Sequence, residues 1–413
     1  MNIGIITIGD EILIGQIINT NAAWMAAQVT AVGGKVVEHA SIGDEAGVLV
    51  STIDRVRQQC DVLLLTGGLG PTHDDITKDV LTSYFDDTLV EDVETTRRLT
   101  LWMQRRNRTL TERNARQAWL PSTCTPLKNP IGTAPGMLFE RDGLVMVSMP
   151  GVPDEMRFIM TNEVLPRLTV RIDAEQRPTW AYRTVYTTGI AESDLADMIG
   201  DTSTFLSGST LAFLPNYLGV RLRIGAKGLT IEERDAELDR VEAVLRDRAG
   251  RFIYGSGDIT LASTVGAALL ARNATVAVAE SCTGGLLAAA ITDVPGSSTW
   301  FPGGVLSYAN EVKVRELGVN PDVLASVGAV SKEVAVAMAA GVRQRYGTTY
   351  GVGITGIAGP GGGTPEKPVG TVWIGLATPD GVMATKFAFG GDRRMNRERS
   401  VGAALGMLLK VLR

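Results

Sequence analysis

Residues 275–291 read TVAVAESCTGGLLAAAI, an apolar run, a turn with two glycines and a second apolar run. The first run, Thr275–Ala279, is typical of a buried strand, and the second, Leu286–Ile291, of the start of a helix. A turn between strand and helix exposes backbone N–H groups at the positive end of the helix dipole, which favours anions and oxyanions. The stretch therefore predicts an α/β unit with a ligand-binding turn at Glu280–Gly285.

Ser281 occupies the place in this turn where a nucleophile would lie. It would equally serve as the N-cap of the following helix. Cys282 is a rival nucleophile because a helix N-terminus lowers the pKa of a thiol, although it could also be a small buried hydrophobe. From these residues we favour Ser281.

Histidine is almost absent from the chain, which has only His39 and His73. A Ser-His-Asp triad is therefore excluded within the C-terminal region, and a serine nucleophile there would need activation by a lysine. Lys313 is the best candidate for this base, with Tyr308 as a relay or second base. Both follow an apolar segment, and loops that follow parallel strands meet at one edge of a sheet.

Four arginines crowd the first turns of the last predicted helix: Arg393, Arg394, Arg397 and Arg399. Cations at a helix N-terminus oppose the helix dipole, which costs stability. A bound phosphate or carboxylate would relieve this conflict. The alternative is a solvated basic face, and for the cluster as a whole we favour anion binding.

A second glycine-rich loop, TGGLGPTHDD at 66–75, leaves the predicted buried strand Asp61–Thr66. Its glycines permit a phosphate to approach the backbone, and Asp74 and Asp75 offer the hard oxygen ligands that divalent cations prefer. Asp10, Glu11 and Glu155 are further candidate ligands, although helix capping explains Asp10 and Glu155 equally well. The helix after this loop contains Lys78.

The chain has 413 residues, a net charge of −5 and three cysteines. Its length predicts two or three domains, and its acidic balance argues against general nucleic-acid binding. The unpaired cysteines predict neither disulfides nor a zinc site. The N-terminal segment lacks a basic region and no apolar run reaches membrane length, so we expect a cytoplasmic protein.

Six ordered segments give the C-terminal region a close resemblance to the CinA family, the nicotinamide-mononucleotide deamidases: AESCTGG (279–285), SYANEVK (307–313), GAVS (328–331), TGIAGPGGG (355–363), EKPVGTVW (366–373) and GDR (391–393). The resemblance implies hydrolysis of nicotinamide mononucleotide (NMN) to nicotinic acid mononucleotide and ammonia, without a cofactor. It implies that Ser281 is the nucleophile, assisted by Tyr308 and Lys313. The expected substrate-binding residues are Glu280, Thr283, Gly284, Gly285, Asn310, Thr355, Gly356, Gly359, Arg393 and Arg399.

The segments TIGDEILIGQ (7–16), TGGLGPTHDD (66–75), NPIGTAPG (129–136) and MPGVPDEM (149–156) resemble the CinA N-terminal domain, which shares its fold with the molybdopterin-binding MoaB/MogA proteins. This resemblance implies an ADP-ribose pyrophosphatase that uses a divalent metal ion (Mg, Mn or Co), with K⁺ as a further candidate ion, to form AMP and ribose 5-phosphate. The expected metal ligands are Asp10, Glu11, Asp74, Asp75 and Glu155. The expected substrate-binding residues are Gly67, Gly68, Gly70, Thr72, Lys78, Asn129, Gly132 and Thr133.

The predicted fold class is α/β, with two parallel-sheet domains at 1–168 and 258–413 joined by a small KH-like α+β domain at 176–255. A polar linker is expected at about 166–180, and a hairpin at Arg141–Gly143. The resemblance implies a homodimer that acts on small nucleotides, and from charge and apolar run length we expect no membrane or nucleic-acid partner. Two alternatives stay open: a molybdopterin-binding protein, and a competence-related scaffold without hydrolase activity.

Overall fold

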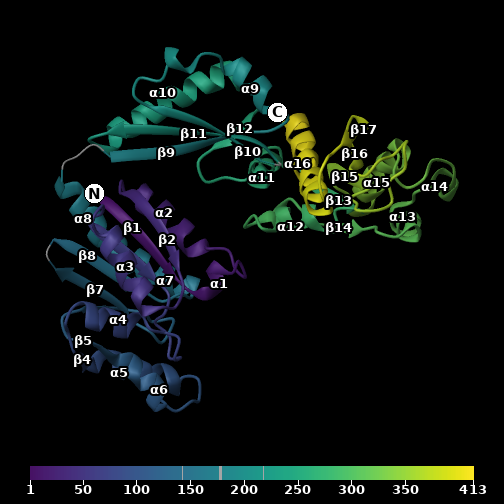
Figure 1. Cartoon of the computed structure of the whole chain (residues 1–413). Coiled ribbons are helices and arrows are strands. Elements are labelled where there is room, and N and C mark those ends of the chain that lie inside the picture. Colours follow the sequence, from purple (N-terminus) through teal and green to yellow (C-terminus); the bar gives the residue numbers. More distant parts are fainter. Residues whose placement is uncertain (142, 176–178, 217) are drawn as a thin grey trace. The chain divides into compact units, whose positions relative to one another are not determined.

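The structure is a computed structural model that describes residues 1–141, 143–175, 179–216 and 218–413 (Figure 1). It divides into two compact units, Met1–Tyr182 with Gly225–Glu237, and Arg183–Ile224 with Leu238–Arg413. Both units therefore contain part of the predicted middle domain. Asp142 of the predicted hairpin and Pro178 of the predicted linker lie outside the described residues.

The N-terminal region is built on a six-stranded sheet of order β2-β1-β3-β8-β7-β6. The strands β2, β1, β3 and β8 are parallel, while β7 and β6 are antiparallel. A two-stranded ribbon of β4 and β5 is separate from this sheet. The strands are β1 (Asn2–Ile8), β2 (Lys35–Ile42), β3 (Val62–Thr66), β4 (Leu89–Glu91), β5 (Trp119–Pro121), β6 (Thr125–Leu127), β7 (Gly136–Arg141) and β8 (Leu144–Met149).

Alternate residues of the central strands enter two different cores, as the two-residue period of a strand requires. Ile3 and Ile5 of β1 pack in a core with α2 and α7, whereas Ile6 and Ile8 pack in a second core with α3 and α4. This explains the continuous apolar runs of strands covered on both faces. The helical elements are α1 (Asp10–Leu13), α2 (Thr20–Ala31), α3 (Ala46–Val56), α4 (Thr77–Tyr84), α5 (Val93–Gln104), α6 (Glu112–Ala115), η1 (Arg116–Ala118), α7 (Pro153–Ile159), η2 (Met160–Val164) and α8 (Leu165–Glu175).

The predicted linker at 166–180 is wrong over most of its length, because α8 continues to Glu175. Leu168 and Ile172 are buried in the same core as α2, and their four-residue spacing places them on one helix face. The polar composition of this segment belongs to the exposed face of an amphipathic helix.

The middle region has a four-stranded sheet of order β10-β11-β9-β12 and two main helices. Its elements are β9 (Thr179–Thr187), α9 (Glu192–Ile199), η3 (Thr202–Thr204), β10 (Thr210–Asn216), β11 (Gly219–Gly228), α10 (Ile231–Ala249) and β12 (Ile253–Ser256). This is the α+β arrangement that the sequence predicts.

The C-terminal region has a five-stranded sheet of order β14-β13-β15-β16-β17. The strands β14, β13 and β15 are parallel, and β16 and β17 are antiparallel, so both large sheets are mixed rather than purely parallel. Its elements are α11 (Leu261–Leu270), β13 (Val276–Glu280), α12 (Leu286–Thr292), η4 (Ser297–Thr299), β14 (Gly303–Leu306), α13 (Asn310–Leu317), α14 (Pro321–Val327), α15 (Lys332–Tyr346), β15 (Tyr350–Gly356), β16 (Thr371–Thr378), β17 (Gly381–Ala388) and α16 (Arg393–Val411).

The strand β13 is covered on both faces. Val276 and Val278 pack in the core that contains α11 and α16, while Ala277 and Ala279 pack in the core that contains α15. Within the described residues, none of the helices combines the length and the apolar character needed to cross a membrane.

Candidate active sites

Ser281 directly follows β13, at the carboxyl edge of the C-terminal sheet. Its amide donates to the Ile354 carbonyl of the neighbouring strand at 3.0 Å, which fixes the start of the turn. The N-cap of α12 is Gly285, in the left-handed conformation with φ of 92°, so Ser281 is not the helix cap. The hydroxyl of Ser281 therefore has no capping role.

Lys313 meets Ser281 across this edge. Its Nζ atom donates to Ser281 Oγ at 3.1 Å, to the Ser307 carbonyl at 2.7 Å and to the Tyr308 carbonyl at 3.3 Å. The sheet explains the meeting, because β13 and β14 are parallel neighbours with Glu280 opposite Leu306, and α13 follows β14 closely.

The ammonium group of Lys313 is almost completely buried, with 1% of the residue exposed. Burial lowers the pKa of Lys313 because it penalises the charged form, although the nearby acidic Glu311 and thiol of Cys282 act in the opposite direction. The three oxygens around Nζ match the three donors of a protonated lysine. A neutral amine formed there would lie within reach of the Ser281 proton.

Cys282 is buried in the hydrophobic core next to Ser281. Burial raises the pKa of the Cys282 thiol to about 11, despite the opposing effect of Lys313 and Arg397. The thiol is therefore protonated at neutral pH, and its environment is that of a small hydrophobe. Of the two candidate nucleophiles, the geometry favours Ser281.

Glu280, an expected substrate contact, instead has an internal role. Its buried carboxylate accepts hydrogen bonds from the amides of Gly285 at 3.1 Å, Leu287 at 3.1 Å and Ala288 at 2.8 Å. These amides form the N-terminus of α12, where a negative charge is favourable. The positive end of this helix is thus neutralised from within the protein.

The donors available for an oxyanion are consequently fewer than the sequence suggests. The Gly285 amide is bonded to Glu280, and the Gly284 amide donates to the Ser281 carbonyl at 3.1 Å. Within the described chain, the amides of Cys282 and Thr283 form no hydrogen bond to another residue. These two amides directly follow Ser281 in the chain and are therefore the candidate donors for an oxyanion.

Tyr308 and Arg393 form a second part of this site. The Tyr308 ring is exposed, with 61% of the residue accessible, and its hydroxyl accepts from Arg393 Nη2 at 3.1 Å. Arg393 Nη1 donates to the Gly359 carbonyl at 2.7 Å. Tyr308 thus contacts Lys313 through its carbonyl and Arg393 through its phenol, and the phenol itself has no hydrogen bond to Ser281 or Lys313.

The other arginines of α16 differ in their partners. Arg399 donates to the Gly390 carbonyl, and Arg394 pairs with Glu398 at 2.9 Å. Arg397, predicted from the sequence as part of the anion-binding cluster, instead donates to the Thr283 carbonyl at 2.7 Å and so supports the turn that carries Ser281. Asp392 caps the helix by accepting from the Met395 amide at 2.8 Å, which offsets part of the dipole conflict.

The remaining predicted residues have mainly structural settings. Thr355 is buried and donates to the Ala329 carbonyl at 2.8 Å. Gly356 leaves no room for a side chain, since a Cβ would lie 2.7 Å from a methyl group of Val372. Asn310 is exposed at the start of α13, near Lys313 in sequence.

Known proteins resemble this chain along its whole length. Residues 4–170 match the family described as a probable molybdopterin binding domain, residues 182–255 the damage-inducible protein CinA KH domain, and residues 258–412 the CinA C-terminal domain. A CinA-like protein of Gemmatimonas aurantiaca is 45% identical over 99% of this chain and 96% of its own length. The chain belongs to the CinA family. A putative competence-damage inducible protein of Halothermothrix orenii is 40% identical over 99% of this chain and 98% of its own.

Among solved structures, a competence/damage inducible protein of Agrobacterium tumefaciens is 40% identical. The match covers 37% of this chain and 93% of that one, with a TM-score of 0.36. The three family matches place the MoaB-like, KH-like and CinA domains in the predicted order, and membership of the CinA family suggests a hydrolase.

The glycine-rich loop of the N-terminal domain is packed tightly against its own sheet. Gly67 has a φ of 115°, and a Cβ there would lie 2.1 Å from the Ile8 carbonyl oxygen. At Gly68, a Cβ would lie 2.2 Å from the hydroxyl of Thr77, which donates to the Gly67 carbonyl at 3.0 Å. Close backbone packing alone therefore requires both glycines.

Asp75 stabilises this loop from within. Its carboxylate accepts from the Gly70 amide at 2.7 Å, from the Thr72 amide at 2.9 Å and from the Thr72 hydroxyl. Asp74 is exposed and lies 4.0 Å from His73 Nδ1, and a hydrogen bond with the Thr72 side chain lowers the pKa of its carboxyl group. Both neighbouring acids therefore interact with Thr72, and Asp75 also accepts from the backbone amides of Gly70 and Thr72.

Glu155, another expected metal ligand, is also engaged. Its Oε2 atom accepts from Asn129 Nδ2 at 2.6 Å, and Asn129 Oδ1 accepts from the Gly132 amide at 3.0 Å. Arg98, which the sequence does not single out, donates to the Gly132 carbonyl at 2.7 Å and to the Thr133 carbonyl at 3.0 Å. The loop at 129–133 is thus held by a network of its own.

The remaining acids lie near the carboxyl end of β1. The Asp10 amide donates to Asp44 at 3.1 Å, and α3 begins after Glu45 without a side-chain cap. Burial raises the pKa of Asp44, and the charges of Asp10, Glu11 and Asp74 raise it further. Within the described residues, no three His, Cys, Asp or Glu side chains are gathered closely enough to hold a metal ion, so the five predicted ligands do not form one set.

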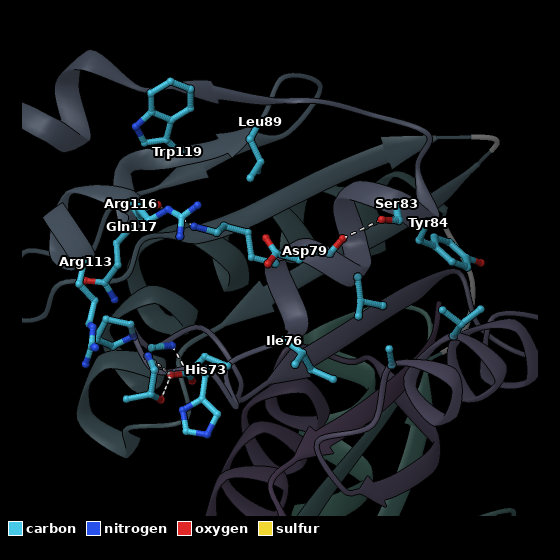
Figure 2. Close-up of a pocket in the computed structure, with 18 of the residues that line it drawn as sticks. His73, Ile76, Asp79, Ser83, Tyr84, Leu89, Arg113, Arg116, Gln117 and Trp119 are labelled. Carbon is cyan, nitrogen blue, oxygen red and sulfur yellow. Dashed lines mark hydrogen bonds between the residues drawn. The ribbon is translucent and has the colours of Figure 1, made fainter.

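A cleft of about 1720 Å³ opens beside the glycine-rich loop (Figure 2). Its walls come from α3, α4, β4, α6, η1 and β5, and four predicted residues line it: Gly70, Thr72, Asp75 and Lys78. Lys78 Nζ donates to the Arg116 carbonyl at 2.7 Å, and burial lowers the pKa of Lys78. Only some of the residues predicted for the N-terminal site therefore line this cleft.

Asn21 is a further residue that the sequence does not single out. Its Nδ2 atom donates to the Gly151 carbonyl at 2.8 Å and to the Thr66 hydroxyl at 3.3 Å. It therefore ties together the chain segments that follow β3 and β8, at the edge where the glycine-rich loop begins. A single asparagine at a helix start gives no sequence signal for this contact.

Proposed function

We propose that this CinA family member is a bifunctional pyridine-nucleotide hydrolase whose C-terminal domain deamidates NMN to nicotinic acid mononucleotide and ammonia. The observation that carries the proposal is the 3.1 Å contact between Lys313 Nζ and Ser281 Oγ in a buried site. A serine hydroxyl needs a base to become a nucleophile, and this chain has no histidine after His73.

In the proposed reaction, Ser281 Oγ attacks the carboxamide carbon of NMN while its proton passes to neutral Lys313. The oxyanion accepts hydrogen bonds from the amides of Cys282 and Thr283. Collapse breaks the carbon–nitrogen bond, and Lys313 returns the proton to the departing ammonia. Water then attacks the acyl-serine ester, Lys313 accepts its proton, and the proton passes back to Ser281 as the carboxylic acid leaves.

We assign the phosphate of NMN to Arg393 rather than Arg399. Arg393 is bonded to two neutral groups, the Tyr308 hydroxyl and the Gly359 carbonyl, and keeps its full charge for an anion. It also connects to Lys313 through Tyr308. The role of Tyr308 in this scheme is to hold Arg393 at the mouth of the site.

For the N-terminal domain we propose hydrolysis of ADP-ribose to AMP and ribose 5-phosphate, as the resemblance implies. Lys78 and the loop at Gly70–Thr72 would hold the diphosphate. A divalent cation, Mg, Mn or Co, would offset the charge that develops there. Among the predicted ligands, Asp10, Glu11 and Asp74 are exposed, and these carboxylates would have to turn toward the cation, because they do not form a ready metal site in this structure.

Ammonia release from NMN by the full chain tests the C-terminal proposal. We expect Ser281→Ala to abolish release while ADP-ribose hydrolysis on the same sample is unchanged. The matched variant Cys282→Ala should keep most of the deamidase activity. Folded wild-type protein that releases no ammonia would sink the proposal, and loss of activity in Cys282→Ala would overturn the choice of nucleophile.

Chelation tests the N-terminal proposal separately. A chelator should stop AMP formation from ADP-ribose, and adding back Mg, Mn or Co should restore it, while ammonia release stays constant. We also propose that the protein is a cytoplasmic homodimer, which light scattering of the purified chain would check.

A further inference from the structure

The cleft beside the glycine-rich loop contains a buried amide with an unused atom. Gln117, in η1, lines the cleft and is only 4% exposed. Its Nε2 atom donates to the Leu69 carbonyl at 3.4 Å. Its Oε1 atom is fully buried and, within the described part of the chain, has no hydrogen-bond partner.

The orientation of this amide is fixed by its neighbour. Reversing the amide would place Oε1 against the Leu69 carbonyl, and two acceptor oxygens repel one another. The unused atom is therefore an acceptor, and it needs a donor. Leaving a buried acceptor unpaired is costly, so a ligand that supplies an O–H or N–H group would gain from pairing with it.

The surroundings of Gln117 favour a phosphorylated ligand. Lys78 Nζ is bonded to the carbonyl of Arg116, the residue directly before Gln117, and Leu69 belongs to the glycine-rich loop. Figure 2 shows Arg113, Arg116 and Gln117 together along one wall of the cleft. The carboxylate of Asp75 in this area accepts hydrogen bonds from its own loop, and the cleft is also lined by Asp54, Asp79 and Glu112. The Lys78 amine thus lies at the peptide group that joins Arg116 to Gln117.

We propose that Gln117 is a specificity-determining residue of the N-terminal domain, where its Oε1 atom accepts a hydrogen bond from a ribose hydroxyl of a bound nucleoside 5′-phosphate. A sugar hydroxyl is the donor found closest to a phosphate in such ligands, which matches the placement of Gln117 beside Lys78. This inference rests on the nucleotide function proposed for the N-terminal domain and identifies the side chain that recognises the ribose.

Binding of AMP, 2′-deoxy-AMP and 3′-deoxy-AMP to the full chain, measured by calorimetry, tests the proposal. One deoxy analogue should bind roughly 10-fold more weakly than AMP, because it leaves Oε1 unpaired. In Gln117→Leu, the affinities of AMP and that analogue should become equal. The control is Ser83→Ala, which lines the same cleft but whose hydroxyl is bonded to the Asp79 carbonyl of its own helix, and which should keep the discrimination.

Wild-type protein that binds all three nucleotides equally, or none of them, overturns the proposal without any variant. Discrimination that persists in Gln117→Leu overturns it as well. ADP-ribose turnover is measured on the same wild-type sample. Turnover without sugar discrimination contradicts only the role of Gln117, whereas discrimination without turnover contradicts only the proposed hydrolysis.

Discussion

The two glycine-rich turns of this chain use their predicted residues in opposite ways. At the C-terminal turn, Ser281, Lys313, Tyr308 and Arg393 are linked by one chain of hydrogen bonds. At the N-terminal turn, the predicted ligands are divided among local networks, and Asp75 and Glu155 each hold their own loop. This difference indicates that carboxylates in glycine-rich loops often stabilise the loop itself, because they accept hydrogen bonds from its exposed amides.

The largest expected effect at the C-terminal site comes from removing the amine of Lys313. Lys313→Met should lower kcat/KM for ammonia release from NMN about 1000-fold or more, because it removes the base. The same substitution at the exposed Lys332 is the control. Retention of more than a tenth of the activity in Lys313→Met, with ADP-ribose turnover intact, would show that Ser281 does not depend on this lysine.

The assignment of the phosphate contact gives the next largest effect. Arg393→Ala should raise KM for NMN about 10- to 100-fold, because it removes a charge-assisted contact, while Arg399→Ala should change it less than about threefold. With nicotinamide riboside, which lacks the phosphate, the two variants should be alike. Equal effects of both variants on NMN would argue for a general basic face.

Glu280 tests whether the internal cap positions the nucleophile. Glu280→Gln should lower kcat/KM for NMN about 10-fold and the free energy of unfolding by about 1–3 kcal/mol, because an amide has one acceptor oxygen for the three backbone donors. Glu333→Gln, an exposed glutamate of α15, is the matched control. An unchanged melting temperature together with unchanged activity would show that the cap is dispensable.

The smallest effect is expected for a substitution of Glu155 in the N-terminal domain. Glu155→Gln keeps an oxygen that can accept from Asn129, so ADP-ribose turnover should stay within about threefold and stability within about 1 kcal/mol. Asp10→Asn, measured in parallel, should reduce turnover more. A collapse of turnover in Glu155→Gln that extra metal restores would show that Glu155 is a metal ligand after all.

The sequence predicts contacts between segments that follow neighbouring parallel strands. The segments at 279–285 and 307–313 meet because β13 and β14 are adjacent, as expected for loops that follow parallel strands. The sequence does not reveal Arg98, whose acceptors lie 31–35 residues away in another loop, or Asp44, which bonds to Asp10 34 residues away. Such contacts depend on how loops fold over the edge of the sheet, and local sequence patterns do not predict this.

The pH dependence of ammonia release tests most directly whether the neutral amine of Lys313 activates Ser281. The base must be neutral to act, so kcat/KM should rise with pH and level off above the pKa of Lys313, which burial places below the ordinary 10.5. The residual activity of Lys313→Met should lack this rise. A wild-type profile that is flat across the range, or a rise that survives in Lys313→Met, would contradict activation of Ser281 by a buried amine.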